Sequence, residues 1–133
     1  MKLQLKVGQT SQRLAIFILD SSSTTGAGKT GLTNTSMTWY YWREDAGNTG
    51  GTVVSVVSAT LGTFTSGGFI EKDSSHMAGF YEIGVPNAAL ASGAKWVNMV
   101  LTATGAAPLT LEIELVAYDP YDAVRMGMTC LPN

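Results

Sequence analysis

The chain has 133 residues, of which 45% are hydrophobic and only 14% are charged, and its formal net charge is −2. This length allows one domain with a sizeable core, and the scattered Lys and Arg residues provide no basic surface for nucleic acid or an anionic membrane. The single cysteine, Cys130, excludes an intrachain disulfide. No apolar run approaches the roughly 20 residues of a membrane helix. Residues 1–7 alternate polar and apolar, unlike a signal peptide, so we expect a soluble protein without a classical export signal.

Short segments with strand character, separated by turn signals, follow one another along the chain. Leu3, Leu5 and Val7 share one face of the first segment, whereas residues 14–19 are apolar throughout and are expected to be covered on both faces. The segments expected as strands are 2–7, 14–19, 37–42, 53–57, 68–71, 79–85, 96–104 and 108–117. Roughly eight strands at this spacing, without βαβ alternation, predict an all-β fold, an antiparallel β-sandwich over residues 1–118.

Two short helices are predicted beside the strands. Residues 86–93 begin with proline and end with glycine, which favours about two helical turns. The C-terminal tail, residues 119–133, starts with Asp119 as a helix N-cap and Pro120 as the first helical residue, and Gly127 ends the helix. It carries too much apolar surface to remain in water, so it either packs back on the sandwich or meets another chain, and we expect it to be an attachment segment. Its apolar residues are Tyr121, Val124, Met126, Met128 and Leu131.

A glycine-rich segment, residues 20–34, partly matches a nucleotide-binding loop. Gly28-Lys29-Thr30 matches the end of a Walker A motif, but Ser23 occupies the position of its first glycine. The residues after Thr30 lack a helical apolar period, so there is no helix N-terminus to bind phosphate. We therefore interpret the segment as a long, flexible connection between two strands.

The remaining polar residues predict no catalytic, cofactor or metal site. Glu71, Asp73 and the single histidine, His76, match no closed set of metal ligands, so a solvated loop is expected there. No Gly-x-Ser-x-Gly elbow occurs. Glu112 and Glu114 lie side by side on one strand rather than across a cleft. The sequence thus favours a protein without enzymatic activity.

Four consecutive aromatic residues occupy residues 39–42. A strand would direct Trp39 and Tyr41 to the core, and Tyr40 and Trp42 to the opposite face. Exposed aromatic rings can stack on sugars or fill an interface pocket. It is an equally good interpretation that these rings only cover the second face of the sheet.

Several strand and turn motifs form a recurrent pattern: Leu14–Gly28, Gly68-Phe-Ile-Glu71, Met77-Ala-Gly-Phe-Tyr81, Val85-Pro-Asn-Ala-Ala-Leu90 and Leu111–Arg125. On these residues, nearly the whole chain resembles the N-terminal module of tailed-bacteriophage fibre and baseplate-type virion proteins. The resemblance implies a β-sandwich that attaches to a virion and often precedes a trimeric shaft. Such modules usually continue past Asp119-Pro-Tyr-Asp122, whereas this sequence ends at Asn133.

The resemblance implies a structural protein of the phage virion, a fibre-, neck- or baseplate-associated adaptor that forms a homotrimer and contacts other virion proteins. One alternative is a capsid decoration (cement) protein. Another is a carbohydrate-binding receptor module in which Tyr40 and Trp42 contact a host glycan. The candidate interface residues are Tyr40, Trp42, Tyr121, Val124, Met126, Met128 and Leu131.

Overall fold

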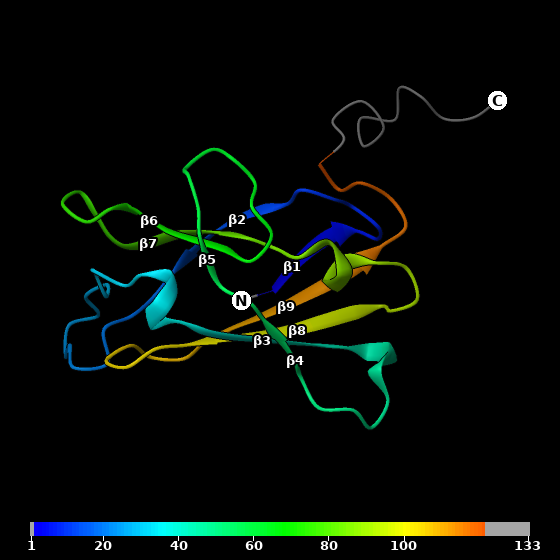
Figure 1. Cartoon of the computed structure of the whole chain (residues 1–133), viewed down its shortest axis with the longest axis horizontal. Helices are drawn as coiled ribbons and strands as arrows, with labels where there is room; N and C mark the ends of the chain where they lie inside the picture. The colour runs from blue at the N-terminus through cyan, green and yellow to red at the C-terminus, as the bar shows by residue number, and fades with distance from the viewer. Residues whose placement is uncertain (1, 122–133) are drawn as a thin grey trace.

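The computed structural model describes residues 2–121, which form nine strands in two sheets and three 3₁₀ segments (Figure 1). The five-stranded sheet has the order β1-β9-β8-β3-β4, and the four-stranded sheet has the order β2-β7-β6-β5. The strands are β1 (Lys2–Lys6), β2 (Arg13–Phe17), β3 (Thr38–Arg43), β4 (Thr52–Val54), β5 (Val57–Ser58), β6 (Gly68–Asp73), β7 (Met77–Gly84), β8 (Trp96–Thr102) and β9 (Leu109–Val116). The prediction of an all-β fold is confirmed.

The sheets are mixed rather than purely antiparallel, so that part of the prediction is wrong. β1 pairs with β9 in parallel, and β5 pairs with β6 in parallel, whereas the other pairs of neighbouring strands are antiparallel. Alternation of apolar residues specifies which face of a strand is buried, but it does not specify the direction of the neighbouring strand. β1 and β9 lie near opposite ends of the chain, so no hairpin turn forces them to run antiparallel.

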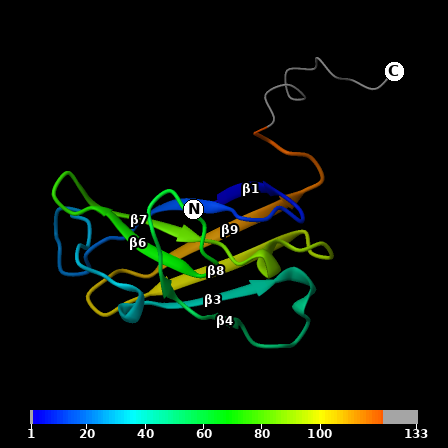
Figure 2. The same cartoon turned by 45° about the horizontal axis from the view of Figure 1, so that its top comes forward.

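Buried side chains from both sheets form one hydrophobic core. In Figure 1, β2, β6 and β7 lie above β3, β8 and β9, and in the turned view of Figure 2 β6 and β7 remain above β8 and β3. The largest fully buried side chains are Trp39, Tyr81, Phe69, Ile16, Ile18, Ile83, Leu90, Leu101, Leu111, Ile113, Val85 and Val97. The last strand alternates between the two faces, since Leu111, Ile113 and Leu115 are buried while Glu112 is exposed.

β2 does not have two covered faces, contrary to the prediction from its continuous apolar sequence. Ile16 and Ile18 are each 1% exposed, but Phe17 and Leu19 are each 37% exposed. β2 is an edge strand of the four-stranded sheet, and successive side chains point to opposite faces. The apolar side chains on its outer face therefore remain accessible.

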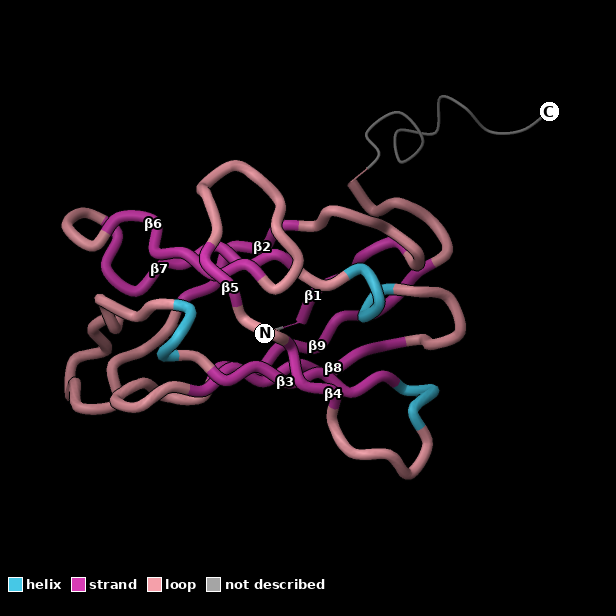
Figure 3. Tube along the Cα trace, in the orientation of Figure 1, coloured by secondary structure: helices cyan, strands magenta, loops and turns pink. Residues whose placement is uncertain are grey.

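The helix predicted over residues 86–93 is present as a short 3₁₀ segment, η3 (Asn87–Leu90), shown in cyan in Figure 3. Arg43 connects it to β3 by donating hydrogen bonds to the carbonyl oxygens of Ala88 and Ala89 at 3.1 and 3.0 Å. The same guanidinium donates to Asp45 at 3.0 Å, and this hydrogen bond holds the pKa of the Asp45 carboxyl below its usual range. Arg43 thus anchors η3 to the end of β3.

Two further 3₁₀ segments, η1 (Asn34–Ser36) and η2 (Glu44–Ala46), were not predicted. η1 precedes β3 and η2 follows it, and each contains three residues. No helix in residues 2–121 has the length and hydrophobicity that crossing a membrane requires.

Candidate functional site

The exposed aromatic residues of β3 lie on the outer face of the five-stranded sheet. Trp39 is fully buried, and Tyr41 packs against the core from the same side of the strand. Tyr40 is 41% exposed, and Trp42 is half-buried on the opposite side. The predicted division is confirmed for Trp39 and Tyr40, whereas Tyr41 and Trp42 are both partly buried.

Strand register brings polar side chains from other strands next to these rings. Trp42 lies opposite Asn98 of β8, Asn98 lies opposite Glu112 of β9, and Glu112 lies opposite Lys2 of β1. Together they border a surface hollow of about 550 Å³. The hollow is lined by Lys2, Tyr40, Tyr41, Trp42, Gly51, Asn98, Met99, Val100, Thr110, Leu111 and Glu112. Sequence reasoning missed Asn98 and Lys2 because no local pattern shows which strands become neighbours.

Trp42 is held in place at the wall of this hollow. Its indole Nε1–H donates a hydrogen bond to the carbonyl oxygen of Thr49 at 3.0 Å. Its ring lies 5.6 Å from the ring of Trp96, with 37° between the planes. Aromatic pairs at this separation attract each other, so the orientation of the Trp42 ring is set before any ligand binds.

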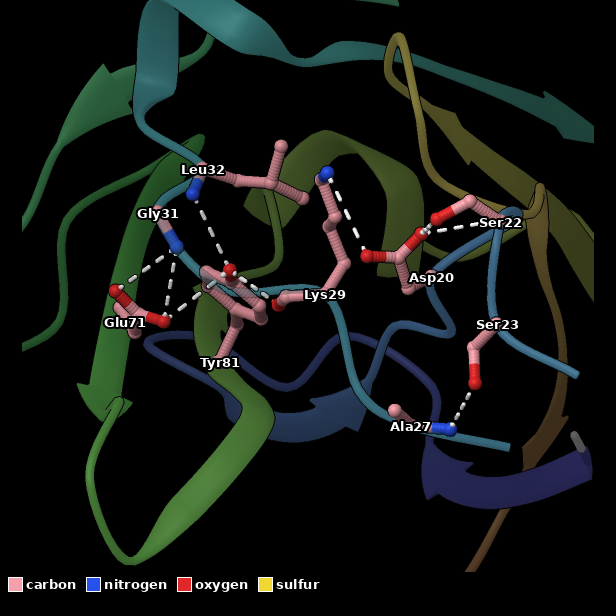
Figure 4. A network of polar contacts seen from close by, with 9 residues as sticks. All are labelled: Asp20, Ser22, Ser23, Ala27, Lys29, Gly31, Leu32, Glu71 and Tyr81. Atoms are coloured by element: carbon pink, nitrogen blue, oxygen red, sulfur yellow. Dashed lines mark hydrogen bonds and ion pairs between the residues drawn. The ribbon is translucent and has the colours of Figure 1, made fainter. Parts of the chain in front are cut away.

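The glycine-rich segment forms a network of polar contacts with the four-stranded sheet (Figure 4). The Tyr81 hydroxyl donates to the carbonyl oxygen of Lys29 at 2.7 Å and accepts a hydrogen bond from the Leu32 N–H at 3.3 Å. The Gly31 N–H donates to both oxygens of the Glu71 carboxylate, at 3.3 and 3.2 Å. Burial, with a further contribution from the negative charge of Glu71, raises the pKa of Tyr81 above its ordinary value. Tyr81 thus remains an uncharged donor at neutral pH.

Several groups that a phosphate loop would present to its ligand already form contacts within the protein. The Lys29 ammonium lies 3.6 Å from the Asp20 carboxylate, and the Lys29 N–H donates to the carbonyl oxygen of Ile18 at 2.8 Å. The Ala27 N–H donates to Ser23 Oγ at 2.9 Å. Hydrogen bonds from Ser22 and the positive charge of Lys29 lower the pKa of Asp20. These contacts connect the segment to its surroundings and occupy the N–H groups of Ala27, Lys29 and Gly31, which supports the interpretation as a connection between strands.

Replacing Lys29 with alanine is expected to change the stability by less than about 1 kcal/mol, because a partly exposed ion pair contributes little. The Lys29 side chain is 29% exposed, and its partner Asp20 is 25% exposed. Urea unfolding of the wild type and Lys29→Ala measures this difference. Micromolar binding of ATP by the wild type, abolished by the substitution, would contradict the interpretation of the loop.

The acidic loop residues do not converge on one point. Asp73 accepts hydrogen bonds from the backbone of Ser75 and His76, and its second oxygen lies 3.0 Å from His76 Nδ1. Hydrogen bonds from the His76 backbone and side chain lower the pKa of Asp73. Glu71 instead contacts Gly31 and Tyr81. Within residues 2–121, no three His, Cys, Asp or Glu side chains are placed to hold a metal ion.

A second apolar surface lies on the outer face of the four-stranded sheet. Phe17 of β2 and Phe80 of β7 are paired across the strands, with ring centroids 5.3 Å apart. They are 37% and 36% exposed, and Leu19, two residues after Phe17, is 37% exposed. We call Phe17, Leu19 and Phe80 the phenylalanine patch. The uninterrupted apolar sequence of residues 14–19 predicts a strand covered on both faces, whereas its outer side chains Phe17 and Leu19 belong to this patch.

Only the beginning of the C-terminal tail lies within the described residues. The Tyr121 N–H donates to Asp119 Oδ1 at 2.9 Å, which is a contact expected of an N-cap residue. Tyr121 is 70% exposed and borders a shallow hollow that shares Lys2 with the aromatic one. The other candidate tail residues, Val124, Met126, Met128 and Leu131, lie outside the described residues, as does the predicted helix after Tyr121.

Comparison with known proteins identifies no relative from which a function could be transferred. No protein-family model matches the chain, and no curated protein or solved structure matches it significantly.

Proposed function

We propose that this chain is a structural protein of a bacteriophage virion, an adaptor of the fibre, neck or baseplate that acts through contacts with other proteins. The resemblance of the strand and turn motifs to phage virion modules supports this assignment. The two sheets share one core, and we further propose that they are the layers of a β-sandwich.

The phenylalanine patch is the observation that carries the proposal. Contiguous apolar side chains on a protein surface are candidates for protein–protein contacts. Phe17 and Phe80 contact each other in the described structure, so they form one continuous surface. Only 14% of the residues are charged, so little electrostatic repulsion opposes the association of this surface with another protein. In this proposal the patch is the contact between the subunits of a homotrimer.

Sedimentation of the wild type, Phe17→Ser and Phe80→Ser tests the subunit contact. The wild type should sediment as a trimer, and either substitution should shift it to a monomer with an unchanged β-type circular dichroism spectrum. Val53→Ser is the matched control, because Val53 is 64% exposed on β4 of the other sheet. A monomeric wild type at high concentration, or trimers that persist in both phenylalanine variants, would refute the proposed contact.

Mass spectrometry of purified phage particles tests the virion assignment. A few copies of the chain per particle are expected for an adaptor. Hundreds of copies would favour a capsid decoration protein instead, and complete absence from particles would contradict both roles.

A further inference from the structure

We propose that the hollow on the outer face of the five-stranded sheet binds a neutral pyranose sugar. In this site the rings of Tyr40 and Trp42 contact the sugar, and the side chains of Asn98 and Glu112 hydrogen-bond its hydroxyl groups. The site lies on a different sheet from the phenylalanine patch, so sugar binding does not depend on the proposed subunit contact.

The dimensions of the hollow fit a small sugar. Its volume of about 550 Å³ lies inside the range of about 300–1,000 Å³ that is common for small-molecule sites. The row from Trp42 to Lys2 crosses β3, β8, β9 and β1, which is three strand spacings or about 14 Å. Because the lining side chains are carried by paired strands, their spacing is fixed by the backbone hydrogen bonds of the sheet.

The aromatic wall is suited to the apolar side of a pyranose ring. One face of such a ring presents several C–H groups, which pack on the electron-rich face of an aromatic ring. Tyr40 is 41% exposed, and Trp42 is held by its hydrogen bond to Thr49 and by its contact with Trp96. Because the Trp42 ring is already fixed, it loses less conformational entropy when a ligand binds.

The opposite side of the hollow offers unused hydrogen-bonding groups. Within residues 2–121, the side chains of Asn98, Glu112 and Lys2 make no hydrogen bond or ion pair with another residue. The amide of Asn98 both donates and accepts, and the carboxylate of Glu112 accepts. A sugar hydroxyl can match either group, because it is both a donor and an acceptor.

The charges of the hollow favour an uncharged, hydroxylated ligand. Glu112 and Lys2 lie opposite each other in the strand register, so their charges offset within the site. An apolar protein surface placed over these polar groups would remove them from water without replacing their hydrogen bonds, which costs free energy. A polyhydroxylated ligand replaces those bonds, whereas a second copy of the chain has to bury them.

A glycan array with neutral hexose oligosaccharides and sialylated glycans provides the first test, and tryptophan fluorescence titration of the neutral oligosaccharides that bind provides the affinity. We expect the full chain to bind neutral glycans in preference to sialylated ones. Tyr40→Ala and Asn98→Ala should each weaken binding about tenfold, which corresponds to about 1.4 kcal/mol. Tyr40→Phe keeps the ring and should bind within about twofold of the wild type, a difference of about 0.4 kcal/mol.

Tyr118→Ala is the matched control, because Tyr118 is 50% exposed and does not line the hollow. It should bind like the wild type.

The site is refuted if no neutral oligosaccharide binds at millimolar concentration, if only sialylated glycans bind, or if Tyr40→Ala binds as well as the wild type. It is also refuted if Tyr40→Ala dissociates an oligomer that binds no sugar, since the hollow would then be a subunit contact. Sugar binding by a chain that is absent from phage particles would support this site and contradict only the virion assignment.

Discussion

Gly28→Ala is expected to destabilise the protein by about 3 kcal/mol, because the added methyl group meets backbone atoms that cannot rotate away. A Cβ at Gly28 would overlap the carbonyl oxygen of Ala78 and lie 2.6 Å from the Cα of Gly79. The loop would have to move away from β7 and lose the hydrogen bond from Lys29 to Ile18. Thermal unfolding should show a melting temperature lower by roughly 10 °C.

Gly50→Ala is the control for this substitution. No atom lies within 4 Å of a Cβ built at Gly50, and its backbone does not require a positive φ. Its stability should remain within about 0.5 kcal/mol of the wild type. If Gly28→Ala were equally harmless, the close approach between the loop and β7 would be wrong.

Trp39→Ala is expected to destabilise the protein by about 3–5 kcal/mol, the usual cost of removing a buried tryptophan. Trp39 is fully buried in β3, opposite Val54 of β4 and Leu101 of β8. The substitution leaves a cavity in the core that both sheets line. The midpoint of urea unfolding, followed by far-ultraviolet circular dichroism, measures the loss.

Trp39→Phe and Tyr40→Ala separate burial from the other properties of this aromatic segment. The Trp39 Nε1–H has no hydrogen-bond partner in the described part of the chain, so Trp39→Phe removes an unpaired buried donor along with part of the ring. It should cost clearly less than Trp39→Ala. Tyr40→Ala, on the exposed face of the same strand, should cost no more than about 1 kcal/mol. Equal losses for all three variants would contradict the assigned burial.

Much of the local structure could be predicted from the sequence. Side chains alternate along a strand, so the pattern of residues 109–115 indicates which of them are buried, and that of the aromatic run places Trp39 inside and Tyr40 outside. The turn residues marked most connections, although the helix predicted over residues 86–93 is only a 3₁₀ segment. The missing helix after Thr30 correctly indicated that the glycine-rich segment is a connection.

The outer-face hollow could not be predicted, because its polar side chains come from strands that are distant in sequence. Asn98, Glu112 and Lys2 become neighbours of Trp42 only through the pairing of β3, β8, β9 and β1. Sequence inspection had singled out Tyr40 and Trp42, which are contributed by one strand. It could not supply the groups beside them, because the register between distant strands is set by the packing of the whole sheet.

The sequence by itself determined that the chain is all-β and which residues of most strands face the core, since both follow from the two-residue period of a strand. Only the tertiary structure decided the parallel pairing of β1 with β9 and the exposure of Phe17 and Leu19. It also decided that Gly28 lies so close to Gly79 that no larger residue fits there without a shift. In each case the deciding interaction joins segments far apart in the chain, and a local pattern contains no information about such contacts.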